Sequence, residues 1–117
     1  MRAVAGAAAA YAEAGYFTII DGIVSPGWFL EPLRGWLHAA GHTVAYAILR
    51  PPLDDCVSSA VGRESSRLAD RSIIERLWHD FADLGPWERH VITNATAGPE
   101  ETAEALSERL RIGALNA

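Results

Sequence analysis

The chain has 117 residues, half of them hydrophobic, which allows one compact domain with its own core. Its net charge of −5 is too balanced for a disordered acidic tail and has the wrong sign for a protein that binds the nucleic-acid backbone. All ten basic residues are arginine, which excludes every mechanism that needs a lysine from this chain. No apolar stretch reaches the roughly 20 residues that span a membrane, so we expect no membrane partner.

The first part of the chain predicts a helix, a strand and a second helix. The alanine-rich stretch Arg2–Ala14 predicts a helix ended by Gly15, and it is too weakly hydrophobic for a secretory signal peptide. Tyr16–Asp21 is rich in β-forming residues and predicts a buried strand whose last residue is an acid. A turn is expected at Ser25–Leu30, and a helix with one apolar face at Pro32–Ala40.

The remainder continues this alternation. Thr43–Leu49 is a nearly continuous apolar run, typical of a strand covered on both faces, and Arg89–Thr93 predicts a third, shorter strand. Helices are expected to begin at Asp54, at Asp70 or Ser72, and at Pro99. Strands that alternate with helices favour a single α/β domain over residues 1–117, with right-handed crossovers and a parallel sheet.

Ligands of open parallel sheets bind beyond the carboxyl ends of the strands. This rule places Asp21, Arg50 and the loop at Thr93–Asn94 together at one edge. An acid directly after a buried strand is what nucleoside triphosphatases use to hold magnesium through water. Asp21 is therefore the candidate metal ligand, with an ordinary turn aspartate as the alternative, and Arg50 is interpreted as a structural residue.

Other combinations of reactive side chains carry less weight. Glu75, His79 and Asp83 are spaced by four residues and could bind a metal, but an exposed polar helix face explains them as well. Cys56 is the only cysteine, so it forms no intrachain disulfide and is interpreted as a small buried residue in a cytoplasmic protein. Asp21 as a general base has little support, because no matching histidine or nucleophile is evident.

The order of segments resembles the small P-loop kinases related to chloramphenicol phosphotransferase and the zeta toxins, often described as AAA-type ATP-binding proteins. The resemblance extends over nearly the whole chain. It is carried by Ala14-Gly15-Tyr16, Ile19-Ile20-Asp21-Gly22, Trp28-Phe29-Leu30, Ile48-Leu49-Arg50-Pro51, and Phe81-Ala82-Asp83-Leu84-Gly85 running on to Glu88-Arg89-His90-Val91-Ile92.

This resemblance implies a three-layer α/β fold with a parallel sheet of the P-loop type, and ATP and Mg²⁺ as cofactors. Asp21 falls at the position that organises magnesium, and Arg63 and Arg67 belong to a lid that closes over the phosphoryl group. Thr93 and Asn94 lie beside the nucleotide base. Trp28 and Phe29, behind Asp21, are expected to line the pocket of a small-molecule phosphoryl acceptor.

The sequence departs from this family in one decisive respect. It contains no G-x-x-x-x-G-K-[ST] phosphate loop, and the first strands of the family have no counterpart here. The fold is therefore expected to be incomplete, because the missing strand would lie between Phe17–Asp21 and Thr43–Leu49 and leaves both without a neighbour. Either these two strands pair with each other, or another chain supplies a strand, or the fold stays incomplete. We expect the isolated chain to associate or to be marginally stable. We expect no phosphotransfer by this chain alone. The alternative function is a non-catalytic interaction module that binds a partner through exposed sheet edges.

Overall fold

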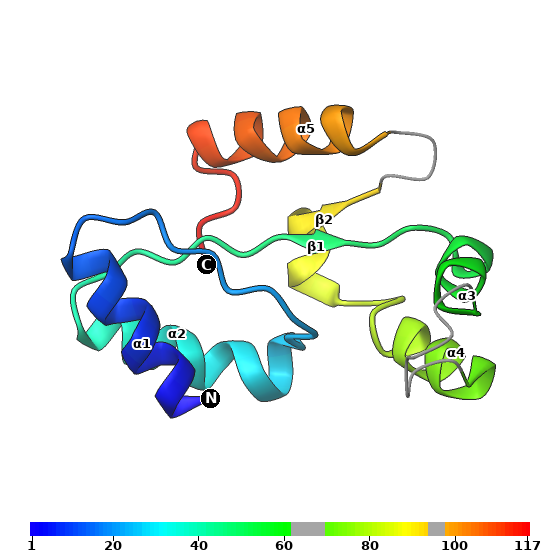
Figure 1. Ribbon diagram of the computed structural model, residues 1–117, viewed down its shortest axis with the longest axis horizontal. Coiled ribbons are helices and arrows are strands. Elements are labelled where there is room, and N and C mark those ends of the chain that lie inside the picture. Colours follow the sequence, from blue (N-terminus) through cyan, green and yellow to red (C-terminus); the bar gives the residue numbers. More distant parts are fainter. Residues whose placement is uncertain (62–69, 94–97) are drawn as a thin grey trace. The chain divides into compact units, whose positions relative to one another are not determined.

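The computed structural model describes residues 1–61, 70–93 and 98–117. Helices account for 61% of these residues, and the only sheet among them has two strands. The expected three-layer parallel sheet is therefore wrong for this chain. The elements in order are α1 (Arg2–Glu13), η1 (Pro26–Leu30), α2 (Glu31–Ala39), β1 (Ile48–Leu49), α3 (Leu53–Val61), α4 (Arg71–Asp80), η2 (Gly85–His90), β2 (Val91–Ile92) and α5 (Pro99–Arg111), as Figure 1 shows.

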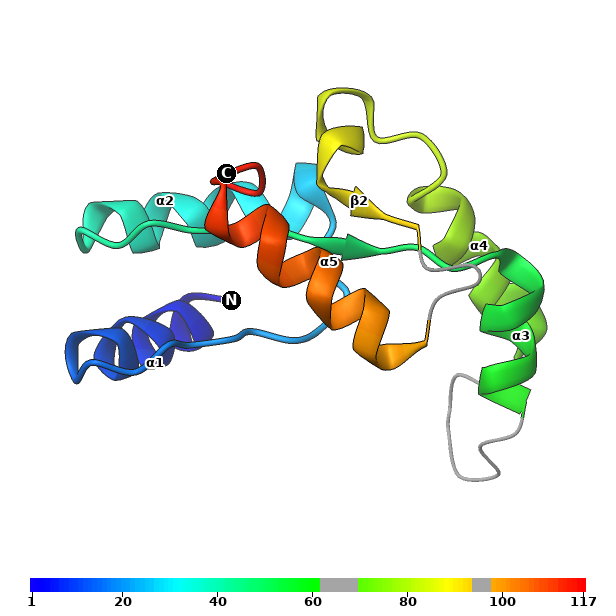
Figure 2. The same ribbon diagram turned by 90° about the horizontal axis from the view of Figure 1, so that it is seen from above.

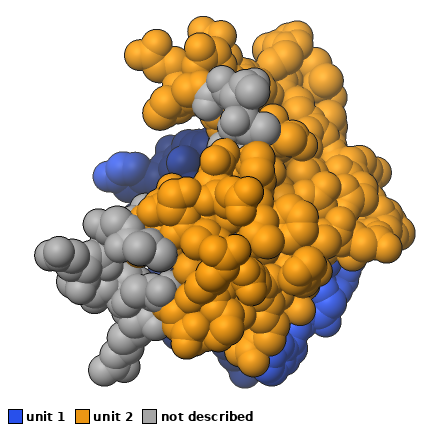
Figure 3. Space-filling model, turned by 90° about the vertical axis from the view of Figure 1, so that its right-hand side faces the viewer, with its two compact units in different colours: residues 1–46, 115–117 blue, residues 47–114 orange. Residues whose placement is uncertain are grey.

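The chain divides into two compact units, which Figure 3 distinguishes by colour. Unit 1 consists of residues 1–46 and 115–117, and unit 2 of residues 47–114. Unit 1 is thus built from two stretches of sequence, whereas unit 2 is continuous. The organisation as one domain stays a prediction.

The core of unit 1 lies between α1 and α2, which run side by side in Figures 1 and 2. Ala5 and Ala8 of α1 pack on Leu33 and Leu37 of α2, and all four are buried. The small alanine side chains let the two helices approach closely, and Ile20 adds to the same cluster. Both helices agree with the sequence-based expectation to within one residue at each end.

The final residues of the chain close unit 1. Asn116 forms an antiparallel bridge with Ala45, and the Tyr46 amide donates to the Leu115 carbonyl at 2.8 Å. Leu115 is fully buried. The Tyr46 hydroxyl donates to the Val24 carbonyl at 2.5 Å. These contacts show why the expected strand Thr43–Leu49 is wrong: its first half pairs with the C-terminal residues, and only Ile48–Leu49 joins the sheet.

Unit 2 is organised around the β1–β2 pair. The two strands are parallel, with Ile48 opposite Val91 and Leu49 opposite Ile92. Helix α5 packs beside β2, and its Arg109 donates to the Val91 carbonyl at 2.7 Å. Helices α3 and α4, which follow β1 in the sequence, pack against each other, as Figure 2 shows.

Several local expectations are corrected by the structure. Tyr16–Asp21 belongs to no strand, because no other described segment pairs with it. The expected strand Arg89–Thr93 shortens to Val91–Ile92, since the residues before it complete the 3₁₀ helix η2. The turn at Ser25–Leu30 is instead one turn of π-helix that leads into α2. Asp54 lies inside the first turn of α3 and does not cap it.

Two helix starts are confirmed. The carboxylate of Asp70 accepts from the Ser72 amide at 2.9 Å and caps α4, so Asp70 is the residue that opens this helix. The hydrogen bonds from Ser72 lower the pKa of the Asp70 carboxyl. Helix α5 begins at Pro99, whose fixed φ suits the first helical position.

Candidate functional site

The most unusual feature of unit 1 is the segment Phe17–Ile23, which we call the open segment. It follows the end of α1, where Gly15 turns the chain with a φ of +89°. None of its backbone N–H or C=O groups forms a hydrogen bond with any part of the chain that the structure describes. The strands of a sheet normally pair these backbone groups with a neighbouring strand. The open segment therefore presents unpaired backbone groups, as the edge strand of a sheet does.

Side chains along the open segment alternate between solvent and the core of unit 1. Phe17 and Ile19 are 81% and 78% exposed, whereas Ile20 packs on the α1–α2 core. Thr18 is also half-buried, and Ile23 is exposed again. From Phe17 to Asp21 this period of two is the geometry of a β-strand, and the chain then bends at Gly22. One face of Phe17–Asp21 is therefore anchored, while the other face and the backbone stay open.

Asp21 lies on this segment, and its exposed carboxylate has no hydrogen bond or ion pair within the described residues. It lines a shallow pocket of about 190 Å³ together with Ile20, Ile23, Val24 and Phe29. Asp21 contributes the only charged side chain of this otherwise apolar pocket. The volume lies below the roughly 300 Å³ at which small-molecule pockets usually begin, so the pocket by itself is too small for a nucleotide.

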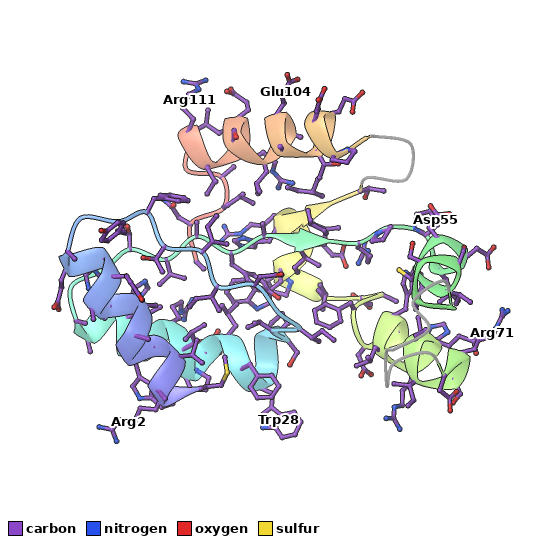
Figure 4. All side chains as sticks on the ribbon, in the orientation of Figure 1. Arg2, Trp28, Asp55, Arg71, Glu104 and Arg111 are labelled. Atoms are coloured by element: carbon purple, nitrogen blue, oxygen red, sulfur yellow. The ribbon has the colours of Figure 1, made fainter. Side chains whose placement is uncertain are left out.

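The two aromatic residues of η1 take different positions. Trp28 and Phe29 stack at a ring-centroid distance of 5.1 Å with 18° between the planes. Trp28 is 76% exposed and projects away from the ribbon in Figure 4, whereas Phe29 is half-buried and lines the pocket. Asp21 and Phe29 are therefore the predicted site residues that the structure brings together.

Of the other predicted site residues, the structure describes Thr93. Thr93 directly follows β2 in unit 2 and is exposed. Arg63, Arg67 and Asn94 lie outside the described residues. The roles of these four residues stay predictions.

Arg50, which directly follows β1, has the structural role that was expected of it. Its guanidinium forms two hydrogen bonds with the Glu88 carboxylate, at 2.8 and 2.9 Å, and donates to the Phe81 carbonyl at 2.7 Å. Glu88 also accepts from the Leu84 amide at 3.0 Å. The hydrogen bonds from Arg50 lower the pKa of the Glu88 carboxyl. Arg50 thus joins β1 to the turn after α4 and to η2.

Glu88 was not recognised from the sequence as the partner of Arg50. The two residues are 38 positions apart, and no local spacing relates them. The burial of His90, which packs on Trp87 with ring centroids 5.0 Å apart, was not predicted either.

The structure supports no pre-formed metal centre. Among the described residues, no group of three or more His, Cys, Asp or Glu side chains could hold a metal ion. A lone carboxylate such as Asp21 fits Mg²⁺ only where water and phosphate oxygens supply the remaining ligands. Burial raises the pKa of the Cys56 thiol, which disfavours the reactive thiolate.

The comparisons with known proteins give no relative, because no family model and no curated protein matches the chain. The resemblance to small P-loop kinases stays a prediction. In the part of the chain that the structure covers, no helix has the length and apolar character needed to cross a bilayer.

Proposed function

We propose that this chain takes part in ATP-dependent phosphoryl transfer to a small molecule as a P-loop kinase-like, cytoplasmic protein, and that it does not carry out the reaction alone. The observation that supports this proposal is the position of Asp21, an exposed and unpaired carboxylate at the end of an apolar extended run. Asp21 would hold Mg²⁺ through water, with phosphate oxygens completing the coordination. Phe29, on the same pocket, and Trp28 would contact the phosphoryl acceptor.

The resemblance supplies the remaining roles in this proposal. Arg63 and Arg67 would balance the charge that develops on the transferred phosphoryl group, and Thr93 and Asn94 would lie beside the base. The chain has no lysine to neutralise the β- and γ-phosphates, and the pocket that Asp21 lines is too small for a nucleotide. Phosphoryl transfer therefore requires a phosphate-binding loop from another polypeptide segment.

The experiment that tests the proposal begins with the DNA that precedes the Met1 codon. An in-frame segment that encodes G-x-x-x-x-G-K-[ST] would give a longer product, and we expect that product to bind MgATP in calorimetry. Asp21→Ala should weaken the binding of MgATP by about tenfold or more, in the range seen when metal-site residues are removed. The matched control is Asp55→Ala, because Asp55 is an exposed carboxylate of unit 2, labelled in Figure 4.

Two results would overturn the kinase proposal. One is a stop codon immediately upstream with no such segment. The other is micromolar binding of ATP by the 117-residue chain that Asp21→Ala abolishes, since phosphate binding would then need no further segment.

A second candidate function is a non-catalytic module that binds a partner protein. The unpaired backbone and exposed apolar side chains of the open segment favour it specifically. Exposed edges of this kind are sites at which other polypeptides add a strand. This candidate does not need ATP, Mg²⁺ or the predicted lid arginines.

A further inference from the structure

The unpaired backbone groups of the open segment indicate what kind of molecule could form hydrogen bonds with them. The N–H and C=O groups of Phe17–Ile23 have no partner among the described residues, and the chain bends at Gly22, so the stretch that a strand can pair with is Phe17–Asp21. Another extended polypeptide offers donors and acceptors at the same repeat, whereas a helix has already used its own. A β-strand is therefore the occupant that matches the main chain.

The side chains add a second requirement. Phe17, Ile19 and Ile23 are 81%, 78% and 54% exposed on the open face of the segment. Tyr16 directly precedes the segment and packs edge to face on Tyr11, with ring centroids 6.1 Å apart. Both tyrosines are also largely exposed. Apolar surface of this kind is covered best by β-branched or aromatic residues of a strand.

The negative charge near the open segment restricts the class of partner further. The exposed carboxylate of Asp21 lies on the segment, and the exposed Glu13 lies at the end of α1 just before it. Opposite charges on neighbouring strands stabilise pairing, and like charges oppose it. A second copy of this chain is a poor occupant, because each copy carries a net charge of −5.

We propose that Phe17–Ile23 is a docking edge for an apolar β-strand of another protein that carries lysine or arginine opposite Asp21. The strand pairs main chain to main chain with the open segment, and its basic side chain forms an ion pair with the Asp21 carboxylate. This inference rests on the second candidate function and names its partner class. It requires no nucleotide.

The test uses a synthetic strand peptide as the probe, with alternating valine and threonine and a lysine at each end. We expect it to bind the full chain and to slow amide hydrogen exchange at residues 17–23. A peptide of the same sequence with alternate amides N-methylated keeps the side chains but loses main-chain donors, and should bind about tenfold or more weakly. A glutamate-flanked peptide should also bind more weakly than the lysine-flanked one.

Variants of the chain locate the interaction. Ile19→Arg should weaken peptide binding by about tenfold and leave the unfolding midpoint unchanged, since Ile19 is 78% exposed. Ile112→Arg is the matched control, because Ile112 is an exposed isoleucine of unit 2, and it should bind as the unaltered chain does. Asp21→Asn should reduce the preference for the lysine-flanked over the glutamate-flanked peptide.

Three results would overturn this inference: no binding of the lysine-flanked peptide, binding that N-methylation does not weaken, or self-association in ultracentrifugation that Ile19→Arg abolishes. The last would assign the edge to a second copy. The kinase proposal is tested separately, by MgATP binding to the longer product. The two proposals can therefore fail independently.

Discussion

Phe17–Ile23 of unit 1 and Ile48–Leu49 of unit 2 are both apolar runs with a charged residue in or beside them, but only the second forms a strand. Ile48–Leu49 lies against Val91–Ile92, and the Arg50 amide extends the ladder by donating to the Ile92 carbonyl at 3.2 Å. No segment among residues 1–61, 70–93 and 98–117 pairs with the open segment in this way. The comparison shows that β-forming residues give an extended chain, while a strand requires a second chain segment to pair with it.

The largest effect that we predict concerns the small core that anchors the open segment. Leu33→Ala should destabilise unit 1 by about 3 kcal/mol, because Leu33 is 4% exposed and half of the other residues in its cluster are alanines, whose side chains cannot fill the cavity. Urea unfolding followed by hydrogen exchange should show α1 and α2 losing protection while β1 and β2 keep theirs. Equal loss of protection in both regions would show that the two units unfold as one.

A smaller effect is expected where unit 2 joins β1 to η2. Arg50→Ala should destabilise the protein by about 1–2 kcal/mol, mainly because the partly buried Phe81 carbonyl loses its hydrogen-bond donor. The ion pair with Glu88 adds little to stability, because the Glu88 side chain is 40% exposed. Arg50→Lys should restore only part of this, since an ammonium cannot make the two-pronged contact with Glu88. Thermal unfolding gives the measurement.

The control for Arg50 is Arg111→Ala. Arg111 pairs with Glu108 on the exposed face of α5, with side chains 70% and 58% exposed, and its removal should leave the melting temperature unchanged. A loss as large as that of Arg50→Ala would contradict the distinction between a structural and a surface ion pair.

The smallest effect concerns Tyr46, whose hydroxyl donates to the carbonyl of Val24, the residue after the open segment. Burial raises the pKa of Tyr46 from 10.0 to about 12. The folded state therefore keeps this proton longer than the unfolded state, so the stabilisation is complete below pH 10.0 and is lost as the pH rises toward about 12. Tyr46→Phe should cost about 1 kcal/mol at neutral pH, for the lost hydrogen bond to Val24.

The pH dependence separates this effect from general alkaline unfolding. Urea midpoints measured from pH 8 upward should fall more steeply for the unaltered chain than for Tyr46→Phe. Parallel curves would show that the Tyr46 hydroxyl does not titrate differently in the folded state.

Helices were predicted well because their signals are local. Gly15 ends α1, Asp70 caps α4 and Pro99 begins α5, and each acts within one turn of its own position. Strands were predicted poorly, since Thr43–Leu49 is divided between the C-terminal residues and β2, and no property of that run indicates its partners. The sequence identified an apolar run that ends in an acid at Asp21, and it also identified Arg50 as structural.

What the sequence could not indicate are contacts between distant positions. Glu88 satisfies Arg50 from 38 residues away, and Tyr46 reaches Val24 from 22 residues away. The exposure of Phe17 and Ile19 was likewise hidden, because the same residues would be buried if a neighbouring strand were present. Phe17–Asp21 was expected to lack a neighbouring strand, and no described segment pairs with it, but its sequence did not indicate which side chains would face solvent.

The pairing of Ala45 with Asn116 has a consequence for the order of events during synthesis. Unit 2 is encoded without interruption and can acquire its contacts as soon as its last helix leaves the ribosome. Most residues of unit 1 precede unit 2 in the sequence, but the amide of Tyr46 has to wait for the carbonyl of Leu115, which follows unit 2. Unit 1 is therefore completed only after unit 2 has been synthesised, and the apolar side chains of the open segment are accessible to other nascent or finished chains throughout that interval.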